Sequence, residues 1–155
     1  MAYIAVLLLV TAVALFATGA AQVWAKQRQR QQEQELLFIG DQYRQAIASY
    51  YRSATGSRYP RTLAALLSDD RVPYTLRHLR KLYRDPMTGD TEWGLIKSPD
   101  GGVMGVYSMA EGAPQKQGGF PSGYEGFAGQ SSYKEWAFVH VPAAPGSSDP
   151  VVESP

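Results

Sequence analysis

The feature that most constrains this chain is the uneven distribution of its charged residues. All 15 basic and 14 acidic residues lie at or after Lys26, so residues 1–25 form one long run without a formal charge. That run reads MAYIAVLLLVTAVALFATGAAQVWA and consists mostly of Ala, Val, Leu and Ile. About 20 apolar residues cross a bilayer core as a helix. We therefore predict a single transmembrane helix over residues 1–25.

A cleaved secretory signal is the alternative interpretation of the same run. Residues 4–17 would form its apolar region, and the small residues Gly19–Ala21 would precede the cut. No Lys or Arg precedes the apolar run, whereas a signal begins with a basic region, and the run continues to Ala25. A retained helix is therefore favoured over a cleaved signal.

The helix is expected to continue beyond the apolar run. No Gly or Pro occurs between Ala20 and Ile39, and residues 27–35 are rich in the helix formers Gln, Glu, Lys and Arg. Farther on, apolar residues recur at steps of three and four, which marks one helical face: Leu36, Ile39, Tyr43, Ala46, Ile47, Tyr50 and Tyr51. Ser53–Ser57 supplies a stop. We predict a continuation over residues 26–57, in which a solvated polar neck (27–35) precedes an amphipathic segment.

Two short helices are expected in the segment after Pro60. The first covers Thr62–Leu67, with Thr62 as its N-cap, and the second covers Thr75–Tyr83, with Leu76 and Leu79 facing inward. From position 71 to 84 the chain has five Lys or Arg and no acid. This basic run suits an acidic partner or lipid headgroups, although a solvated helix face is the favoured interpretation.

Three short strands complete a small domain over residues 58–141. They are expected at Trp93–Lys97, Val103–Met109 and Glu135–Val141, and a tight turn joins the first two. A glycine-rich loop over residues 110–134 is of a length that is usually functional or disordered. The proline-rich residues 142–155 predict a disordered tail.

The predicted fold class is α+β. Three strands alone leave too many backbone groups and too much apolar surface uncovered. The amphipathic helix segment is the obvious cover. We therefore expect a long N-terminal helix with a three-stranded antiparallel sheet packed on its distal half.

The sequence contains no recognisable catalytic, cofactor-binding or metal-binding site, and none is expected. Cysteine is absent, which excludes disulfide scaffolds and thiolate zinc sites. A net charge of +1 gives no electrostatic case for nucleic-acid binding, and we expect no small-molecule substrate. His78 and His140 are more typical of packing or surface than of catalysis. Calcium stays open at four acids whose spacing matches no hand-like loop: Asp85, Asp90, Glu92 and Asp100.

Four further segments follow the apolar helix in a fixed order. They are Leu36–Tyr51 (LLFIGDQYRQAIASYY), Arg58–Pro60 with the leucines at 63, 66 and 67, Tyr83–Gly89 (YRDPMTG) with Trp93-Gly94, and Tyr133–Trp136 (YKEW). In this order the chain resembles type IV pilins and the pseudopilins of type II secretion systems. Numbered from Met1, Ala5 stands where such proteins usually carry a glutamate, which indicates a divergent or minor subunit.

The resemblance implies a structural subunit of a type II secretion or type IV pilus-like assembly that takes part in protein export. It implies a single-pass protein of the bacterial inner membrane with a periplasmic domain, whereas the basic residues 26–30 favour a cytoplasmic location for that end. Partners would be membrane lipid and other pilin-like subunits, reached through the N-terminal helix. Small residues there allow close approach of helices: Ala12, Ala14, Ala17, Gly19 and Ala20. A membrane-tethered extracytoplasmic binding module is the alternative function.

Overall fold

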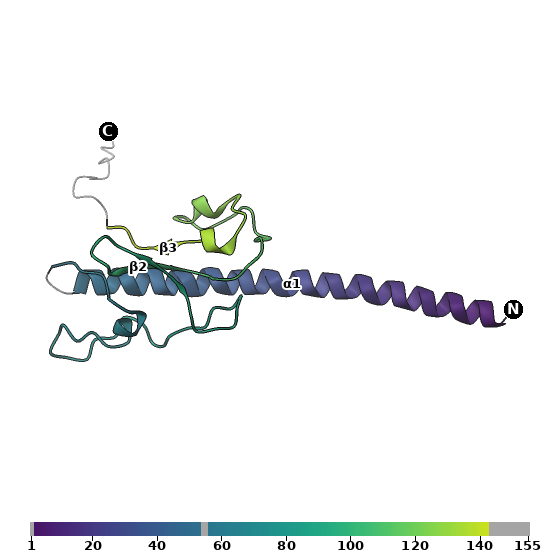
Figure 1. Ribbon diagram of the computed structural model, residues 1–155, viewed down its shortest axis with the longest axis horizontal. Coiled ribbons are helices and arrows are strands. Elements are labelled where there is room, and N and C mark those ends of the chain that lie inside the picture. The colour runs from purple at the N-terminus through teal and green to yellow at the C-terminus, as the bar shows by residue number, and fades with distance from the viewer. Residues whose placement is uncertain (1, 54–55, 143–155) are drawn as a thin grey trace, which may run out of the picture. The chain divides into compact units, whose positions relative to one another are not determined.

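The computed structural model describes residues 2–53 and 56–142, without the side chains of residues 16–20. The tail predicted over residues 142–155 lies outside the described residues from position 143 onward. The described chain is α+β and combines one long N-terminal helix with a small three-stranded antiparallel sheet (Figure 1). The predicted fold class is thus confirmed at this level.

Helix α1 (Ala2–Ser53) contains 52 residues. It runs without interruption through residues 26–35, so the predicted continuation beyond the apolar run is confirmed. Its last residue, Ser53, is the first residue of the predicted stop. Within the described part of the chain, no helix includes a stretch that is both long and apolar enough to cross a membrane. The transmembrane role of residues 1–25 stays a prediction.

The chain divides into two compact units, and each unit is assembled from three segments. Unit 1 comprises residues 1–39, 84–93 and 108–136, and unit 2 comprises the remaining residues, 40–83, 94–107 and 137–155. Each unit therefore contains its own part of α1 together with chain segments that are distant in sequence. Every contact described below lies within one unit.

The sheet belongs to unit 2. It has the order β1-β2-β3 and consists of β1 (Gly94–Lys97), β2 (Val103–Tyr107) and β3 (Phe138–Val139). Both pairings are antiparallel. All three predicted strands are present, but each is shorter than expected. The third was predicted over Glu135–Val141 and is limited to two residues, because the chain just before it forms the 3₁₀ helix η3 (Tyr133–Glu135).

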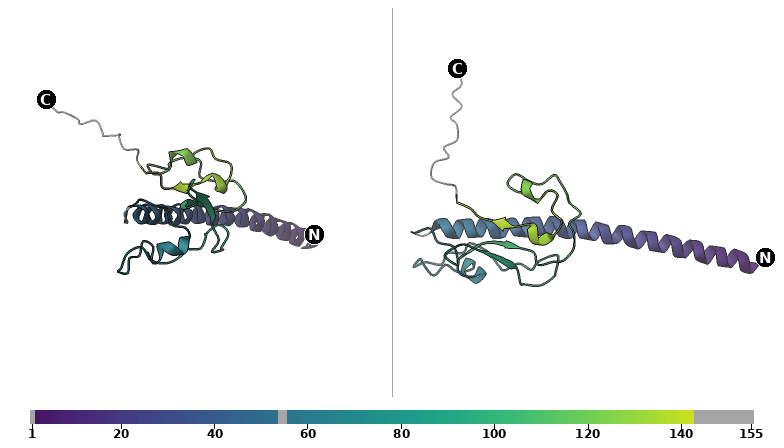
Figure 2. Two further views of the ribbon diagram at one scale, coloured as in Figure 1. Left: turned by 60° about the vertical axis from the view of Figure 1, so that its left-hand side comes forward. Right: turned by 45° about the horizontal axis from the view of Figure 1, so that its top comes forward.

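The apolar stripe of α1 is buried in both units: Leu36 and Ile39 lie in the core of unit 1, and the later stripe residues form much of the core of unit 2. Tyr43 and Ile47 are completely buried there, and Tyr50 is nearly so. Figure 2 shows β3 beside α1, and the contact depends on Gly40, because a Cβ atom at that position would overlap the ring of Phe138. Glycine therefore lets the strand approach the helix backbone. The predicted burial of this stripe is confirmed.

The second predicted helix, Thr75–Tyr83, is wrong. The backbone there pairs with an earlier segment: the N–H groups of His78 and Leu79 both donate to the carbonyl of Leu66, each at 2.9 Å. The N–H of Asp69 donates in turn to the carbonyl of Leu76 at 3.0 Å. These long-range bonds take the place of the i to i−4 bonds of a helix.

The first predicted helix, Thr62–Leu67, is the short 3₁₀ helix η1 (Leu63–Leu66). Thr62 occupies the N-cap position, but its side chain makes no capping hydrogen bond.

The glycine-rich loop folds around aromatic side chains in unit 1. It contains the 3₁₀ helix η2 (Glu125–Phe127), and Phe127 stacks on Trp136 with ring centroids 5.5 Å apart. Phe120 meets the same indole edge-on at 5.3 Å. Tyr133 lies against it from another direction, at 5.7 Å. Phe120, Phe127 and Tyr133 of the loop thus form a small aromatic core with Trp136.

The polar neck of α1 is exposed as predicted at six of its nine residues, but one face, formed by Gln29, Gln32 and Glu33, is packed in unit 1. Glu33 is only 1% exposed. Its carboxylate accepts hydrogen bonds from the backbone N–H groups of Gln115 (2.7 Å) and Lys116 (3.0 Å) and from the hydroxyl of Tyr133 (2.7 Å). A buried carboxylate is tolerable when donors fill its acceptor positions. This face of the helix is therefore covered in spite of its polarity.

Candidate functional site

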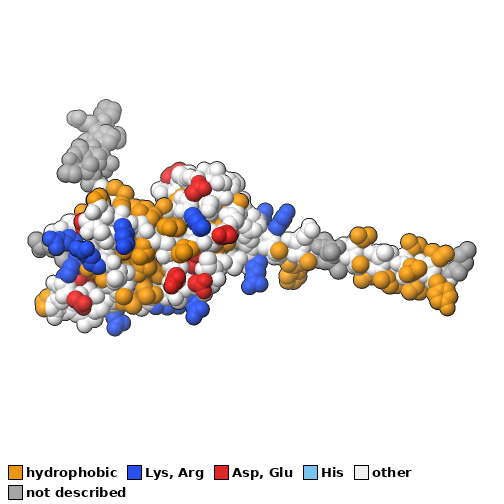
Figure 3. Space-filling view, in the orientation of Figure 1, with side chains coloured by type: hydrophobic (Ala, Val, Ile, Leu, Met, Phe, Trp, Pro, Cys, Tyr) orange, Lys and Arg blue, Asp and Glu red, His pale blue; other side chains and the backbone are white. Residues whose placement is uncertain are grey.

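The first functional candidate is the apolar surface of α1 near its N-terminus, in unit 1. Five consecutive residues, 6–10, are each between 58% and 67% exposed. Since successive residues are about 100° apart around a helix, these five positions cover its whole circumference. Figure 3 shows apolar side chains along this part of the helix. Exposed apolar surface of this extent marks an interaction surface rather than a face in contact with water.

Among residues 6–15 the polar side chain is that of Thr11. The hydroxyl of Thr11 donates to the carbonyl of Leu7 at 2.6 Å, so the helix itself satisfies it. Ala12 and Ala14 lie on the same part of the helix, as predicted, whereas the side chains of Ala17, Gly19 and Ala20 are outside the described ones. The described surface therefore combines bulky apolar side chains with small ones.

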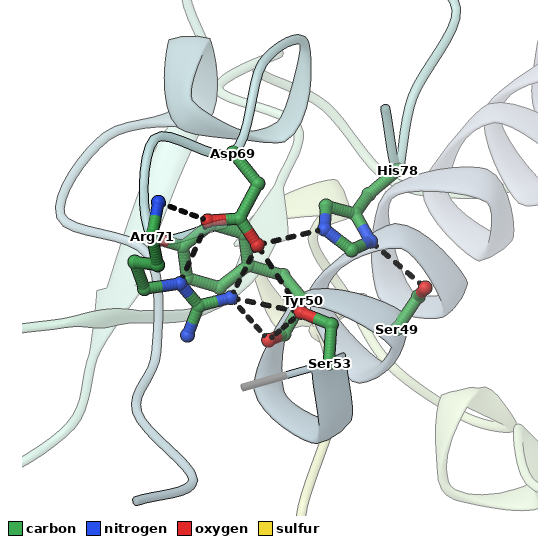
Figure 4. Close-up of polar contacts among 6 residues, drawn as sticks. All are labelled: Ser49, Tyr50, Ser53, Asp69, Arg71 and His78. Carbon is green, nitrogen blue, oxygen red and sulfur yellow. Dashed lines mark hydrogen bonds and ion pairs between the residues drawn. The ribbon is translucent and has the colours of Figure 1, made fainter. Parts of the chain in front are cut away.

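A second candidate is a cluster of polar side chains in unit 2 at the end of α1 (Figure 4). The guanidinium of Arg71 donates to the carbonyl of Tyr50 at 2.7 Å and lies 3.5 Å from the centroid of the Tyr50 ring. It also forms an ion pair of 2.7 Å with Asp69, whose side chain is fully buried. Carbonyls in the last turn of a helix have no acceptor role inside the helix. Arg71 therefore caps the C-terminus of α1.

Asp69 is held in its charged form by this cluster. The hydrogen bonds from the Arg71 side chain keep the pKa of the Asp69 carboxyl well below its usual range, although burial opposes that shift. The hydroxyl of Ser53 adds a further donor at 3.2 Å. The buried carboxylate is thus matched by a cation and by hydrogen-bond donors, as buried charges require.

His78 links Asp69 to Ser49 of α1. Its Nε2 lies 3.2 Å from Oδ2 of Asp69, and its Nδ1 lies 2.8 Å from Oγ of Ser49. A hydroxyl, an imidazole and a carboxylate in series are also the components of a nucleophilic triad. Two features favour a clamp over a triad here: Arg71 already neutralises Asp69, and Ser49 lies inside α1, where the helix uses the nearby N–H groups that an oxyanion would need.

The four acids considered for calcium are divided between the units. Asp85 is completely buried in unit 1, and its carboxylate accepts from the hydroxyl of Ser108 (2.6 Å) and from the N–H of Met87 (2.9 Å). The bond from the N–H of Met87, two residues later, makes Asp85 the first residue of a turn. Asp100 belongs to unit 2 and bonds to Ser98. Over residues 2–53 and 56–142, no group of three or more acids or histidines is arranged to hold a metal ion.

The remaining predicted candidates have separate locations. The ring of His140 packs against Tyr51 and Tyr59 with centroids 5.6 and 6.4 Å away, and burial lowers the pKa of this histidine. Arg77 and Arg80 are exposed in unit 2, whereas Arg84, from the same basic run, is exposed in unit 1.

Two groups of polar residues were not predicted. The face of α1 that carries Leu36 also carries Gln29, Gln32 and Glu33, which precede it at steps of three and four. This spacing could have predicted that the three polar residues are covered. The side chain of Gln32 donates to the carbonyl of Pro86 at 2.9 Å, in the same unit. The second group is Ser49 with His78 and Asp69, and no short motif links those positions.

No protein-family model, curated protein or solved structure matches this chain.

Proposed function

We propose that this protein is a pseudopilin-like structural subunit of a type II secretion or type IV pilus-like assembly and takes part in protein export. One observation carries the proposal: the N-terminal part of α1 exposes large apolar side chains around its whole circumference, in a sequence run without charge. Such a surface is unfavourable in water and neutral in lipid. The proposed location of residues 1–25 is the bacterial inner membrane, with the domain over residues 58–141 in the periplasm.

The same surface supports assembly as well as anchoring. Among apolar helices in lipid, burial of apolar area gives no driving force, so association depends on close packing at small residues. Ala5 and Ala12 are seven positions apart and therefore lie on one face of α1, between bulky residues. We propose that this face contacts the helices of other pilin-like subunits. The proposed role is structural and requires no catalytic group.

Site-specific crosslinking in membranes tests the proposal. Because the chain has no cysteine, an introduced cysteine is its only thiol. A single Leu9→Cys replacement, treated with a bifunctional thiol reagent in whole cells, should give crosslinks to other pilin-like subunits. Ala5→Leu with Ala12→Leu should reduce those crosslinks and the export of cargo several-fold. The matched control, Ala64→Leu with Ala128→Leu, makes the same change at exposed positions outside the apolar run and should leave both unchanged.

Two results would contradict the proposal. The first is the absence of any pilin-like partner among the crosslinked products of the otherwise unaltered chain. The second is unchanged crosslinking and export in the Ala5→Leu, Ala12→Leu variant, which is the behaviour expected of a tethered binding module that works as a monomer.

A further inference from the structure

Unit 2 contains an open hollow that plays no part in the assembly proposed above. Its volume is about 510 Å³. One wall is Gln42 of α1, and the other comes from the non-helical segment that was predicted as a helix, with lining residues Arg77, His78, Leu79, Arg80 and Tyr83. Of these lining residues, Arg77 and Arg80 are exposed, whereas Leu79 and the side chain of His78 are buried.

The two arginines of the hollow carry charge that the described residues do not balance. Elsewhere in unit 2, Arg44 pairs with Asp41 at 2.8 Å and Arg71 pairs with Asp69 at 2.7 Å. Over residues 2–53 and 56–142, no carboxylate lies within ion-pair distance of Arg77 or Arg80. Both side chains are exposed, and the chain has no acid between positions 71 and 84. The hollow is thus electropositive and open to an anion.

The walls of the hollow are fixed by bonds on their far side. The ring of His78 is held between Ser49 and Asp69, and the backbone of Leu79 is tied to Leu66 at 2.9 Å. At the other end, the hydroxyl of Tyr43 accepts from the N–H of Tyr83 at 2.9 Å and lies 3.1 Å from its carbonyl. A site whose walls are already held in place loses less entropy when a ligand binds.

We propose that this hollow binds an acidic peptide segment of a partner protein. The planar guanidinium groups of Arg77 and Arg80 present paired donors that match carboxylates, and the Gln42 amide adds a neutral donor. Apolar side chains stand in the same stretch of chain, since Leu82 is 39% exposed and Tyr74 is 63% exposed. Arginine and tyrosine beside apolar residues are typical of protein interfaces.

A lipid surface fits these observations less well than a peptide. Recognition of anionic lipid usually involves four to eight clustered basic residues or a basic amphipathic helix. Here two arginines line the hollow on a segment with no helix, and the third basic group of residues 77–83, the Lys81 ammonium, lies 5.3 Å from the Tyr83 ring. Concave shape and few charges favour a protruding peptide over a flat membrane.

Fluorescence anisotropy on the purified full chain in a neutral detergent tests the proposal. The probe is a fluorescein-labelled peptide of six glutamates interrupted by two leucines, and the same peptide with glutamine in place of glutamate is the negative probe. Arg77→Gln with Arg80→Gln should weaken binding of the acidic peptide at least about tenfold, since bonds to charged groups are lost. Gln42→Glu, which puts a negative charge in the hollow, should give a similar loss by an independent route.

Arg58→Gln with Lys97→Gln is the matched control, because both residues are exposed in unit 2 outside the hollow and the charge change is the same. It should change the affinity less than about twofold, as expected for a rim or distant charge. Equal losses in the control and the Arg77→Gln, Arg80→Gln variant would overturn the proposal, since they would indicate non-specific attraction. Binding of glycerol phosphate that depends on these arginines, with peptide binding that does not, would also overturn it and indicate a lipid headgroup site.

Discussion

Within the described residues of α1, both units bury apolar side chains, and unit 1 also buries a charged one. In unit 2 the helix buries an apolar stripe, with Tyr43 and Ile47 fully covered, and a glycine admits an aromatic ring. In unit 1 the helix buries Leu36 and Ile39 and, in addition, a carboxylate, Glu33, between three hydrogen-bond donors. Apolar burial is non-directional and depends on volume, whereas a buried charge depends on every donor being in place. We therefore expect both units to be sensitive to changes of size, and unit 1 to be sensitive to the loss of this charge as well.

The largest effect is expected when volume is removed from unit 2. Ile47→Ala deletes part of a fully buried side chain and should lower the free energy of unfolding by about 2–5 kcal/mol, from lost transfer energy and the cavity left behind. Hydrogen exchange should locate the loss in unit 2. Gln45→Ala, at an exposed position two residues earlier, is the control and should cost less than about 0.5 kcal/mol. An unchanged unfolding midpoint for Ile47→Ala would refute the packing role of the stripe.

Removing the buried carboxylate tests the other half of the comparison. Glu33→Ala leaves two backbone N–H groups and one phenol without their acceptor and should cost about 1–3 kcal/mol. The amide hydrogens of Gln115 and Lys116 should exchange faster, which separates this effect from one in unit 2. Glu35→Ala is the matched control, because Glu35 is exposed one half-turn away. Protection of both amides in the Glu33→Ala variant would mean that the carboxylate does not hold this loop.

Replacing Gly40 by a larger residue tests how tightly unit 2 is packed. Alanine in place of glycine inside a helix normally stabilises it by about 1 kcal/mol. Here the new methyl group would overlap the Phe138 ring, so we expect a net loss of about 1–3 kcal/mol from overpacking. Chemical unfolding measures the change. Adding Phe138→Leu to Gly40→Ala should cost less than the sum of the single changes, and additive losses would contradict a direct collision.

The difference between the units also explains what the sequence predicts well. The stripe from Leu36 to Tyr50 has helical periodicity in apolar residues, and such a pattern predicts both the element and its buried face. The hairpin of β1 and β2 is marked by two strand-like runs around a glycine turn. These features rest on local patterns, and the structure contains them with only their ends adjusted.

The unpredicted features depend on partners that are distant in sequence. Thr75–Tyr83 has helical spacing of leucines, but its peptide groups bond to Leu66 and Asp69, and nothing local in the segment signals those bonds. Glu33 looks like a solvated charge until the loop that supplies its donors, 82 residues later, is in place. Long-range polar pairing overrides the helical pattern in the first case and buries a charge on a correctly predicted helix in the second.

The smallest effect is confined to alkaline solution and again concerns unit 1. Burial raises the pKa of the Tyr133 phenol to about 12, helped by its hydrogen bond to Glu33. The usual value is near 10, so folding favours the protonated phenol. That contribution is complete below pH 10 and is lost as the pH rises from about 10 through 12. Stability should fall over this window, and the amides near Glu33 should be among the first in unit 1 to lose protection.

Tyr133→Phe isolates this contribution, because it removes the titrating group and keeps the ring against Trp136. The variant should lose less stability than the unaltered chain between pH 10 and 12, so that the difference between the two narrows as the pH rises. Tyr74→Phe, at an exposed position, should leave the alkaline profile unchanged. Ultraviolet absorbance of the phenolate follows the ionisation directly. If the Tyr133→Phe difference is the same at pH 8 and pH 12, Tyr133 does not couple ionisation to folding, and the dependence of unit 1 on polarity rests on Glu33 and its backbone donors alone.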